Sequence, residues 1–255
     1  MTNFFTMFKK EIREQWKSYK ILFVPVVFII LMVTQPISMK LLPTLLKNEM
    51  PKGAVIHIPT PNSAEIMATI FGKFESMGII LLIIITMGAI AGERDKGITS
   101  LVLSKPIKRS TFFLSKWAAY TILALGSFVI GMIVSAYYTV NLFHGNLLFG
   151  DVTISTVLYL PVIMLIISIS LCFSSFIKSP MYAGFLSVAT YFLIMKIPPY
   201  LFKKGSFFIP DELITKANDI IVGKSVSIEG PLITVLILNL LFVLLGNYLL
   251  TKQEI

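Results

Sequence analysis

Long apolar runs alternate with short polar segments along this chain. Six runs are long enough, or nearly so, to cross a membrane as helices: residues 21–40, 76–91, 117–138, 157–177, 181–195 and 232–250. A transmembrane helix needs about 20 apolar residues, because each residue adds about 1.5 Å along the helix axis. The fifth run is the shortest and ends before Pro198 and Pro199. The pattern predicts an all-α membrane protein with six transmembrane helices in a single domain, residues 1–255.

The first twenty residues follow a different pattern. Apolar side chains recur at spacings of three and four, with basic residues between them; the apolar set is Phe4, Phe5, Phe8, Ile12 and Trp16. This spacing is typical of an amphipathic helix that lies in a membrane interface, and we predict one over residues 2–20. The alternatives are a solvated basic leader and a cleaved signal peptide, although no small-x-small cleavage site follows the first apolar run.

Two polar segments contain helical signals of their own. Asn62 and Glu65 have the spacing of a capping box, so a helix is expected to begin there and to continue into the second span. In the segment 196–231, helical spacing is seen at Leu213, Ile214, Ala217, Ile220 and Ile221. Because the fifth span is short, we expect this segment to return towards the membrane.

Composition agrees with the pattern and adds an orientation. The chain is 56% hydrophobic and only 14% charged, whereas about a quarter of the residues of a soluble protein are charged. Thirteen of the 22 lysines and arginines lie in the two termini, in residues 92–116 and at Lys178. The positive-inside rule therefore predicts that both termini and the segment 92–116 are cytoplasmic.

Several kinds of chemistry are not expected. None of the six predicted cores contains Asp, Glu, Lys, Arg or His, which argues against ion-coupled transport, proton relays and intramembrane metalloproteases. One cysteine permits no internal disulfide, and the two histidines, His57 and His144, are far apart. We predict no catalytic, cofactor-binding or metal-binding residue and no nucleic-acid partner. The hydroxyl groups in the cores, such as Thr86, Ser168 and Ser174, are interpreted as helix-packing contacts.

A charged segment, residues 92–116, separates the second and third spans. It opens with alternating charges at Glu93, Arg94 and Asp95, continues through an apolar ridge, and closes on basic residues after Pro106. A short helix with Ile98, Leu101 and Val102 on one face and charges around them would suit a helix-in-groove contact. Pro106 disfavours helical geometry at the residue before it, which predicts a bend between this helix and the third span.

This segment resembles the first cytoplasmic loop of ABC-2 type transporter permeases. The positions that carry the resemblance are Glu93, Asp95, Gly97, Leu101, Leu103, Ser104, Pro106, Arg109 and Lys116. The sequence departs from the family at Ile98, where threonine commonly follows the glycine. The six-span layout, with an N-terminal interface helix and a long last outer loop, extends the resemblance over most of the chain.

The resemblance implies a role for the segment and a set of partners. It would be the coupling helix that docks into a cytoplasmic ABC ATPase, and two permease chains, identical or homologous, would assemble with two ATPase chains. The expected coupling residues are Glu93, Arg94, Asp95, Gly97, Ile98, Leu101, Val102, Leu103, Ser104, Pro106 and Arg109. ATP and magnesium would be bound by the partner, because this chain has no Walker motif. The expected location is the plasma membrane of a bacterium, surrounded by lipid.

The leading hypothesis is therefore the permease subunit of an ATP-driven ABC exporter. An alternative from another class is a membrane scaffold or sensor that recruits a cytosolic partner through the same loop without transporting anything. A membrane enzyme is a third hypothesis, and it would need a catalytic group that the sequence does not offer.

Overall fold

The computed structural model describes residues 2–49, 62–99, 107–143, 147–201 and 209–253. Within these ranges every regular element is a helix and none is a strand. The elements are α1 (Thr2–Lys17), α2 (Lys20–Glu49), α3 (Ser63–Lys73), the π-helix η1 (Phe74–Gly78), α4 (Ile79–Met87), α5 (Ala91–Asp95), α7 (Arg109–Phe143), α8 (Phe149–Phe176), α9 (Pro180–Met195), α10 (Pro198–Leu201), α11 (Glu212–Ile221) and α12 (Glu229–Lys252).

Six helical stretches are long and apolar enough to cross a membrane. They confirm the prediction of an all-α protein with six candidate spans. The stretches are Lys20–Pro43, Ser63–Asp95, Arg109–Phe143, Phe149–Phe176, Pro180–Tyr200 and Glu229–Lys252. The fifth helix, α9, begins and ends within a residue of the predicted span.

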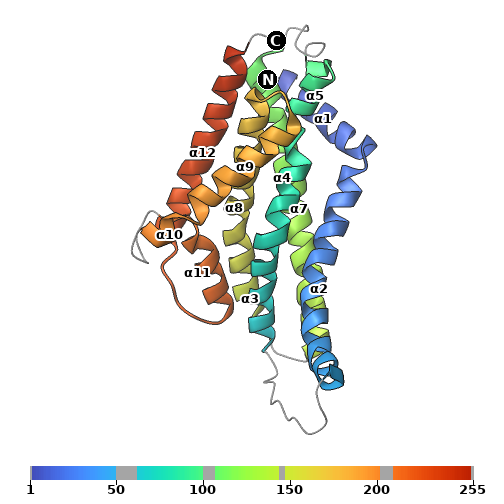
Figure 1. Ribbon diagram of the computed structural model, residues 1–255, viewed down its shortest axis with the longest axis vertical. Coiled ribbons are helices and arrows are strands. Elements are labelled where there is room, and N and C mark those ends of the chain that lie inside the picture. Colours follow the sequence, from blue (N-terminus) through green and yellow to red (C-terminus); the bar gives the residue numbers. More distant parts are fainter. Residues whose placement is uncertain (1, 50–61, 100–106, 144–146, 202–208, 254–255) are drawn as a thin grey trace.

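The helices form an elongated bundle with both chain ends at the same end (Figure 1). We call this the terminal end, where α5 also lies, and we call the opposite end the far end. Helix α8 is central, because it packs against α4, α7, α9, α11 and α12. The most apolar part of α8 is 72% buried within the chain, against 22% for that of α12. Helix α8 therefore forms the centre of the bundle, and α2 packs on α7 and α3 instead.

The second span is much longer than the apolar run that predicted it. Its helix begins after Asn62, whose backbone N–H donates to Glu65 Oε2 at 3.1 Å, and this confirms the predicted helix start. Lys73 and Glu75 continue the helix without a break, although they interrupt the apolar pattern. The π-helical turn η1 lies at this polar interruption, between α3 and α4.

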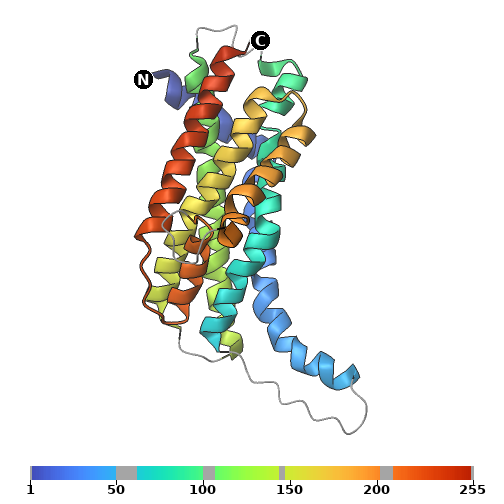
Figure 2. The same ribbon diagram turned by 60° about the vertical axis from the view of Figure 1, so that its left-hand side comes forward.

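Helix α2 departs from the bundle in its last turns. It contains Pro25, Pro36 and Pro43, each of which lacks the N–H of a helical hydrogen bond and bends a helix. Figure 2 shows its C-terminal part swinging away from the other helices. Along its first half α2 packs closely on α7, and Gly131 of α7 faces the backbone of Phe28.

The segment after α9 folds back onto the bundle at the far end. Helix α11 lies against α8 and α3, and it buries Leu213, Ile214, Ala217 and Ile221, which are four of the five residues whose spacing predicted it. The ammonium group of Lys196 bonds to Asp211 Oδ1 at 2.8 Å and also to the carboxylate of Glu75. These ion pairs fix the segment to both α9 and η1.

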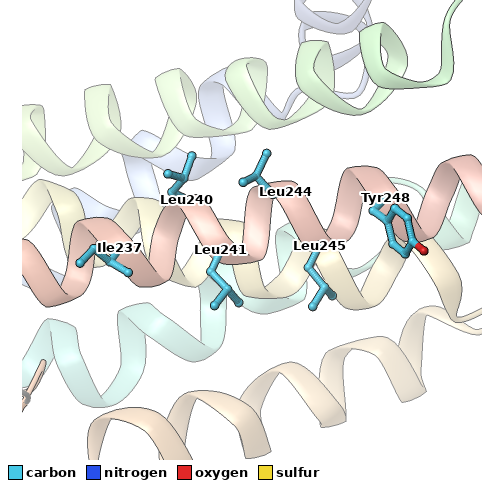
Figure 3. Close-up of a pocket in the computed structure, with 6 residues that line it drawn as sticks. All are labelled: Ile237, Leu240, Leu241, Leu244, Leu245 and Tyr248. Carbon is cyan, nitrogen blue, oxygen red and sulfur yellow. The ribbon is translucent and has the colours of Figure 1, made fainter.

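The outer surface of the bundle is strongly apolar. Helix α12 exposes a row of side chains, shown in Figure 3, that lines a shallow depression: Ile237, Leu240, Leu241, Leu244, Leu245 and Tyr248. All six come from one helix. An apolar surface of this extent suits the hydrocarbon of a membrane, where exposed leucines carry no penalty.

Candidate functional site

Five charged residues from three elements meet at the terminal end of the bundle. Helix α1 contributes Lys10, Glu11 and Glu14, α5 contributes Glu93, and α7 contributes Lys116. We call these residues the ion cluster. Glu93 and Lys116 are 23 residues apart and flank the predicted coupling segment, while Glu11 is 105 residues from Lys116. The cluster therefore joins the N-terminal helix to both sides of that segment.

Lys116 is the buried centre of the ion cluster. Its side chain is 1% exposed, and its ammonium group donates to Glu11 Oε2 at 2.9 Å and to Glu93 Oε1 at 2.7 Å. Both carboxylates are themselves almost fully buried. Charges are seldom buried in this way unless they are paired, because each loses its hydration. One buried ammonium thus holds two helices against α7.

Lys10 closes the ion cluster on its outer side. Its ammonium group lies 2.8 Å from Glu14 Oε2, 3.0 Å from Glu11 Oε1 and 3.3 Å from Glu93 Oε1. Partial burial opposes the charged form, but the bond to Glu14 and the charges of Glu11 and Glu93 together raise the pKa of Lys10. Burial also opposes ionisation of Glu14, and the bond to Lys10 and the charge of Lys116 lower the pKa of that carboxyl group. Both groups are therefore charged at neutral pH.

Three carboxylates this close together would also be a possible metal site. Oxygen atoms of Glu11, Glu14 and Glu93 lie within 4.8 Å of one another. The ammonium groups of Lys10 and Lys116 already bond to these carboxylates. The lysines supply the positive charge that a metal ion would bring, so the arrangement is an ion-pair network.

The ion cluster depends on a buried stripe of α1 that carries one apolar and two polar side chains. Met7, Glu11 and Gln15 are spaced four residues apart, and all three are buried. Of the predicted apolar face, Phe5 is 71% and Trp16 69% exposed, whereas Phe4, Phe8 and Ile12 are half-buried. The position of that face in a membrane interface stays a prediction.

A break in the second span directs the chain into the coupling segment. Helix α4 ends at Met87 and α5 begins at Ala91. The hydroxyl of Ser174 in α8 accepts hydrogen bonds from the backbone N–H groups of Ile90 (3.1 Å) and Ala91 (2.9 Å), and it donates to the carbonyl of Met87 at 2.7 Å. One side chain therefore satisfies the backbone groups that the break exposes.

Both arginines of the predicted coupling set bond within the bundle. Arg94 donates to the carbonyl of Ser175 at 2.6 Å. Arg109 donates to the last carbonyls of α12, at 3.0 Å to Thr251 and also to Leu250 and Gln253. A cation at this position satisfies carbonyl groups that a helix end leaves open. These two arginines therefore fix the edges of the segment to α8 and α12.

The exposed part of the segment begins at Asp95. Asp95, Lys96 and Gly97 are exposed, and Ile98 is 38% exposed. Gly97 has φ +70°, a left-handed conformation that glycine adopts without strain. Leu101, Val102, Leu103, Ser104 and Pro106 lie outside the described residues, so their predicted role stays a prediction.

Hydroxyl groups in the apolar core bond to neighbouring helices, as the packing interpretation predicts. Ser168 of α8 bonds to Asn239 Oδ1 of α12 at 2.6 Å and accepts from Trp117 Nε1 of α7 at 2.8 Å. Thr86 of α4 bonds to Ser170 of α8 at 2.7 Å. These bonds tie four spans together around α8.

A large apolar cavity lies between α7 and α8 in their far-end halves. Its volume is about 670 Å³, and its walls include Met132, Tyr137, Phe149 and Leu160. The polar groups that line it are already engaged: Asn141 donates to the carbonyl of Tyr137, and Thr156 to that of Val152. The cavity thus offers apolar surface and little specific hydrogen bonding.

The sequence pattern singles out Glu93, Arg94 and Arg109 in the segment 92–116 but does not give their partners. Lys116 is one of the positions that carry the family resemblance, but no pattern in the sequence predicts that it is buried or that Glu11 is its partner. The available signals are a lysine at the edge of an apolar run and two acids, Glu11 and Glu14, in a helix whose other charged residues are basic. Nothing in the sequence pairs Lys116 with Glu11, because they are 105 residues apart.

Comparisons with known proteins agree with this architecture. The family described as "ABC-2 family transporter protein" matches residues 5–255. A curated relative, the "Uncharacterized transmembrane protein YxlG" of Bacillus subtilis (strain 168), is 28% identical over 222 residues, which cover 85% of this chain and 84% of the relative. The family match, residues 5–255, includes the ion cluster, the segment 92–116 and all six candidate spans. The chain belongs to the ABC-2 family of transporter proteins and is a multi-pass membrane transport component, not itself a catalytic subunit.

Proposed function

We propose that this chain is the permease subunit of an ATP-driven exporter, that it forms the substrate pathway as a dimer, and that separate ATPase subunits drive it through residues 92–116 on the cytoplasmic side. The observation that carries the proposal is the anchoring of that segment in a chain of the ABC-2 family. Its two flanks, Glu93 and Lys116, bond directly to each other and to α1.

This anchoring supports a mechanical role for the segment. A force applied to an exposed loop is transmitted only if the ends of the loop are fixed to the elements that must move. Here Arg94 fixes one flank to α8 and Arg109 fixes the other to α12, while Lys116 joins α5, α7 and α1. A partner that displaces Asp95 to Ile98 would therefore act on four of the six spans and on α1 at once.

The exposed residues provide the sharpest test of the coupling. Reversing the charge of Lys96 and replacing Ile98 by Asp should abolish co-purification of an ABC ATPase from native membranes, because both side chains are exposed on the segment. The matched control is Lys224→Glu, an exposed lysine between α11 and α12. The coupling role is refuted if the variants at Lys96 and Ile98 retain the ATPase as well as the control does. Reversal of Arg94 or Arg109 is less suitable, because both bond within the bundle.

Accessibility to a thiol reagent tests the proposed orientation. The only cysteine, Cys172, is buried, and replacing it by alanine gives a background for new cysteines at Lys96 and Lys224. A membrane-impermeant maleimide added to intact cells should label position 224 and leave position 96 unlabelled until the membrane is permeabilised. The reverse result would place the coupling segment outside the cell and refute the proposal.

The exposed apolar faces are compatible with a second permease chain. The apolar stretches of α2, α9 and α12 are 28%, 28% and 22% buried within this chain. Most of their surface is therefore left for lipid or for a partner helix. Cross-linking in native membranes, with the mass of the product measured, should give a dimer of permease chains; monomers alone would contradict this part of the proposal.

The alternative is a scaffold or sensor that recruits a cytosolic partner through the same segment without transport. Both functions predict that a partner is retained, so binding alone does not separate them. Measurements of ATP hydrolysis and of cargo accumulation in reconstituted vesicles separate the two functions. Accumulation that depends on ATP supports the exporter, whereas a stable complex with no accumulation favours the scaffold. The apolar walls of the 670 Å³ cavity favour a lipid-like or amphipathic cargo for this assay.

A further inference from the structure

Three charged residues attach the first turn of α11 to the bundle. Lys196 follows α9, Glu75 lies in η1, and Asp211 is the N-cap residue of α11. The Lys196 ammonium group bonds to Asp211 Oδ1 at 2.8 Å and to the carboxylate of Glu75. We call these residues the Lys196 triad. The side chain of Lys196 is 36% exposed, so water reaches this triad, whereas Lys116 in the ion cluster is sealed.

The other end of α11 is a glycine turn. Gly223 adopts φ +82°, and its N–H donates to the carbonyl of Ile220 at 2.9 Å. Residues 224–228, which lead to α12, belong to no regular element. Hinges are commonly a few residues at the end of an element, and glycine has access to more backbone conformations than other residues. Rotation at this turn would therefore move α11 without breaking a helix.

Polar atoms that are buried and have no hydrogen-bond partner among the described residues gather in the elements around α11. They are the hydroxyl oxygens of Ser63 in α3, Ser155 and Tyr159 in α8, and Tyr191 in α9, together with Asn218 Oδ1 in α11 itself. Both tyrosines interact electrostatically with Glu75 and Asp211 of the Lys196 triad. A buried polar atom without a partner is unfavourable, and it recovers hydration when it is uncovered. The closed position of α11 is therefore only partly matched to what it covers.

We propose that α11 is a lid that opens as a unit about Gly223, and that Lys196 is the latch that holds it closed. The apolar face of α11, buried against α8 and α3, favours the closed position. The unpartnered polar atoms oppose it, so the two ion pairs of Lys196 decide the balance. Segments that open separately from the rest of a protein are those held by few buried contacts. The proposal rests neither on export nor on the coupling role of residues 92–116.

A cysteine on the buried face of α11 reports this opening. Ala217 is 0% exposed, so Ala217→Cys, made in the Cys172→Ala background, places the only thiol under the closed lid. A second protein keeps Cys172 as its only cysteine. Cys172 lies in α8 and is 1% exposed, so it reports opening of the whole bundle. The measurement is the rate at which a thiol-reactive dye labels each purified protein in detergent.

Lys196→Met removes the latch and should raise the labelling rate at position 217 by at least about tenfold, the factor that corresponds to about 1.4 kcal/mol. The rate at Cys172 should not change. The matched control is Lys224→Met, which removes an exposed lysine from the same segment. Lys224 pairs with Asp219 of α11 at 2.8 Å, and its loss should leave both rates unchanged.

Equal labelling of position 217 in Lys196→Met and Lys224→Met would overturn the latch. A parallel rise at Cys172 would show that the bundle loosens as a whole, and labelling of position 217 at the rate of an exposed thiol before any latch residue is changed would show no closed lid; either result overturns the proposal. Asp211→Ala decides the proposal if Lys196→Met does not fold, because it keeps the bond between Lys196 and Glu75 and removes only the attachment to α11. It should raise the rate at position 217 alone, and an unchanged rate would overturn the latch.

Discussion

The substitution Lys116→Met should destabilise the protein more than any change at an exposed charge. Lys116 is 1% exposed and bonds to two carboxylates, Glu11 and Glu93, that are also buried. Methionine retains much of the side-chain volume but removes the charge. The two carboxylates then share a desolvated site as like charges, with Lys10 as the cation that is left in contact with both.

Removing one partner of a buried ion pair typically costs about 3–5 kcal/mol, because the remaining charge stays buried and uncompensated. For a domain of 150–250 residues, each kcal/mol lowers the melting temperature by about 2–4 °C. The expected decrease for Lys116→Met is therefore roughly 6–20 °C. Because Lys10 still contacts both carboxylates, we expect a decrease towards the lower end of this range. The exposed pair of Lys224 with Asp219 should be worth at most about 1 kcal/mol.

The assay uses the only cysteine as its reporter. Cys172 lies in the last two turns of α8 and is 1% exposed, so a thiol-reactive dye should react only as the bundle opens. The melting temperature in detergent is read from dye fluorescence for the unmodified protein, Lys116→Met and the control Lys224→Met. Adding Glu11→Gln to Lys116→Met should recover part of the loss, because it removes one of the two like charges.

Two results would refute this reasoning. The first is a melting temperature for Lys116→Met within about 2 °C of that of the Lys224→Met control. This difference is below the smallest shift expected for a buried pair, so it would mean that the ion cluster does not stabilise the fold. A double variant no more stable than Lys116→Met would mean that repulsion between Glu11 and Glu93 is not the cause of the loss. With the single variant Glu11→Gln added, the unmodified protein, the two single variants and the double variant form a cycle that measures the Glu11–Lys116 coupling.

Three further substitutions test other contacts in the same dye assay. Arg109→Gln removes the cation that bonds to the carbonyl groups at the end of α12. The free energy of unfolding should fall by about 1.5 kcal/mol, the low end for a bond to a charged group, because this arginine is only half buried. No change would mean that other groups bond to these carbonyls. Ser174→Ala leaves two backbone N–H groups open at the break before α5 and should cost about 1–3 kcal/mol, and a neutral result would argue against that break. Gly246→Ala places a Cβ 2.7 Å from a ring carbon of Phe113 and 3.0 Å from the Cα of Cys172. Overpacking of this kind destabilises a protein by about 1–3 kcal/mol. The control Gly72→Ala, at an open helical position, should leave stability unchanged or raise it.

The six spans could be predicted from sequence because the hydrocarbon of a membrane disfavours a charged side chain at every position of a spanning helix. A run without charges is a strong signal, and α9 followed it within a residue at each end. The ends of the other helices were less predictable. The capping box at Asn62 predicts the helix that passes through Lys73 and Glu75, but no local pattern predicts the ion pair of Glu75 with Lys196, 121 residues away.

The candidate site could be predicted only as a segment. The sequence pattern places Glu93, Arg94 and Arg109 in one charged segment, but it does not give the direction in which each side chain points. In a five-residue helix such as α5, consecutive residues point to different sides, and this geometry directs Glu93 towards Lys116 and Arg94 towards α8 while Asp95 stays exposed. A charge in a loop is usually interpreted as facing the solvent, and that interpretation fails where a buried partner arrives from a distant helix.

The ion cluster also determines what kind of coupling the protein can support. A single contact between the loop and one span would let that span move alone. Here the same ammonium group holds α1, α5 and α7, and a buried ion pair is far more costly to break than to carry along as one unit. Motion that begins in the segment 92–116 should therefore displace α1 and the start of α7 together. If spin labels at exposed positions of α1 and α7 changed their mutual distance when ATP binds to the assembled transporter, the cluster would be a hinge, and the rigid connection argued from Lys116 would be wrong.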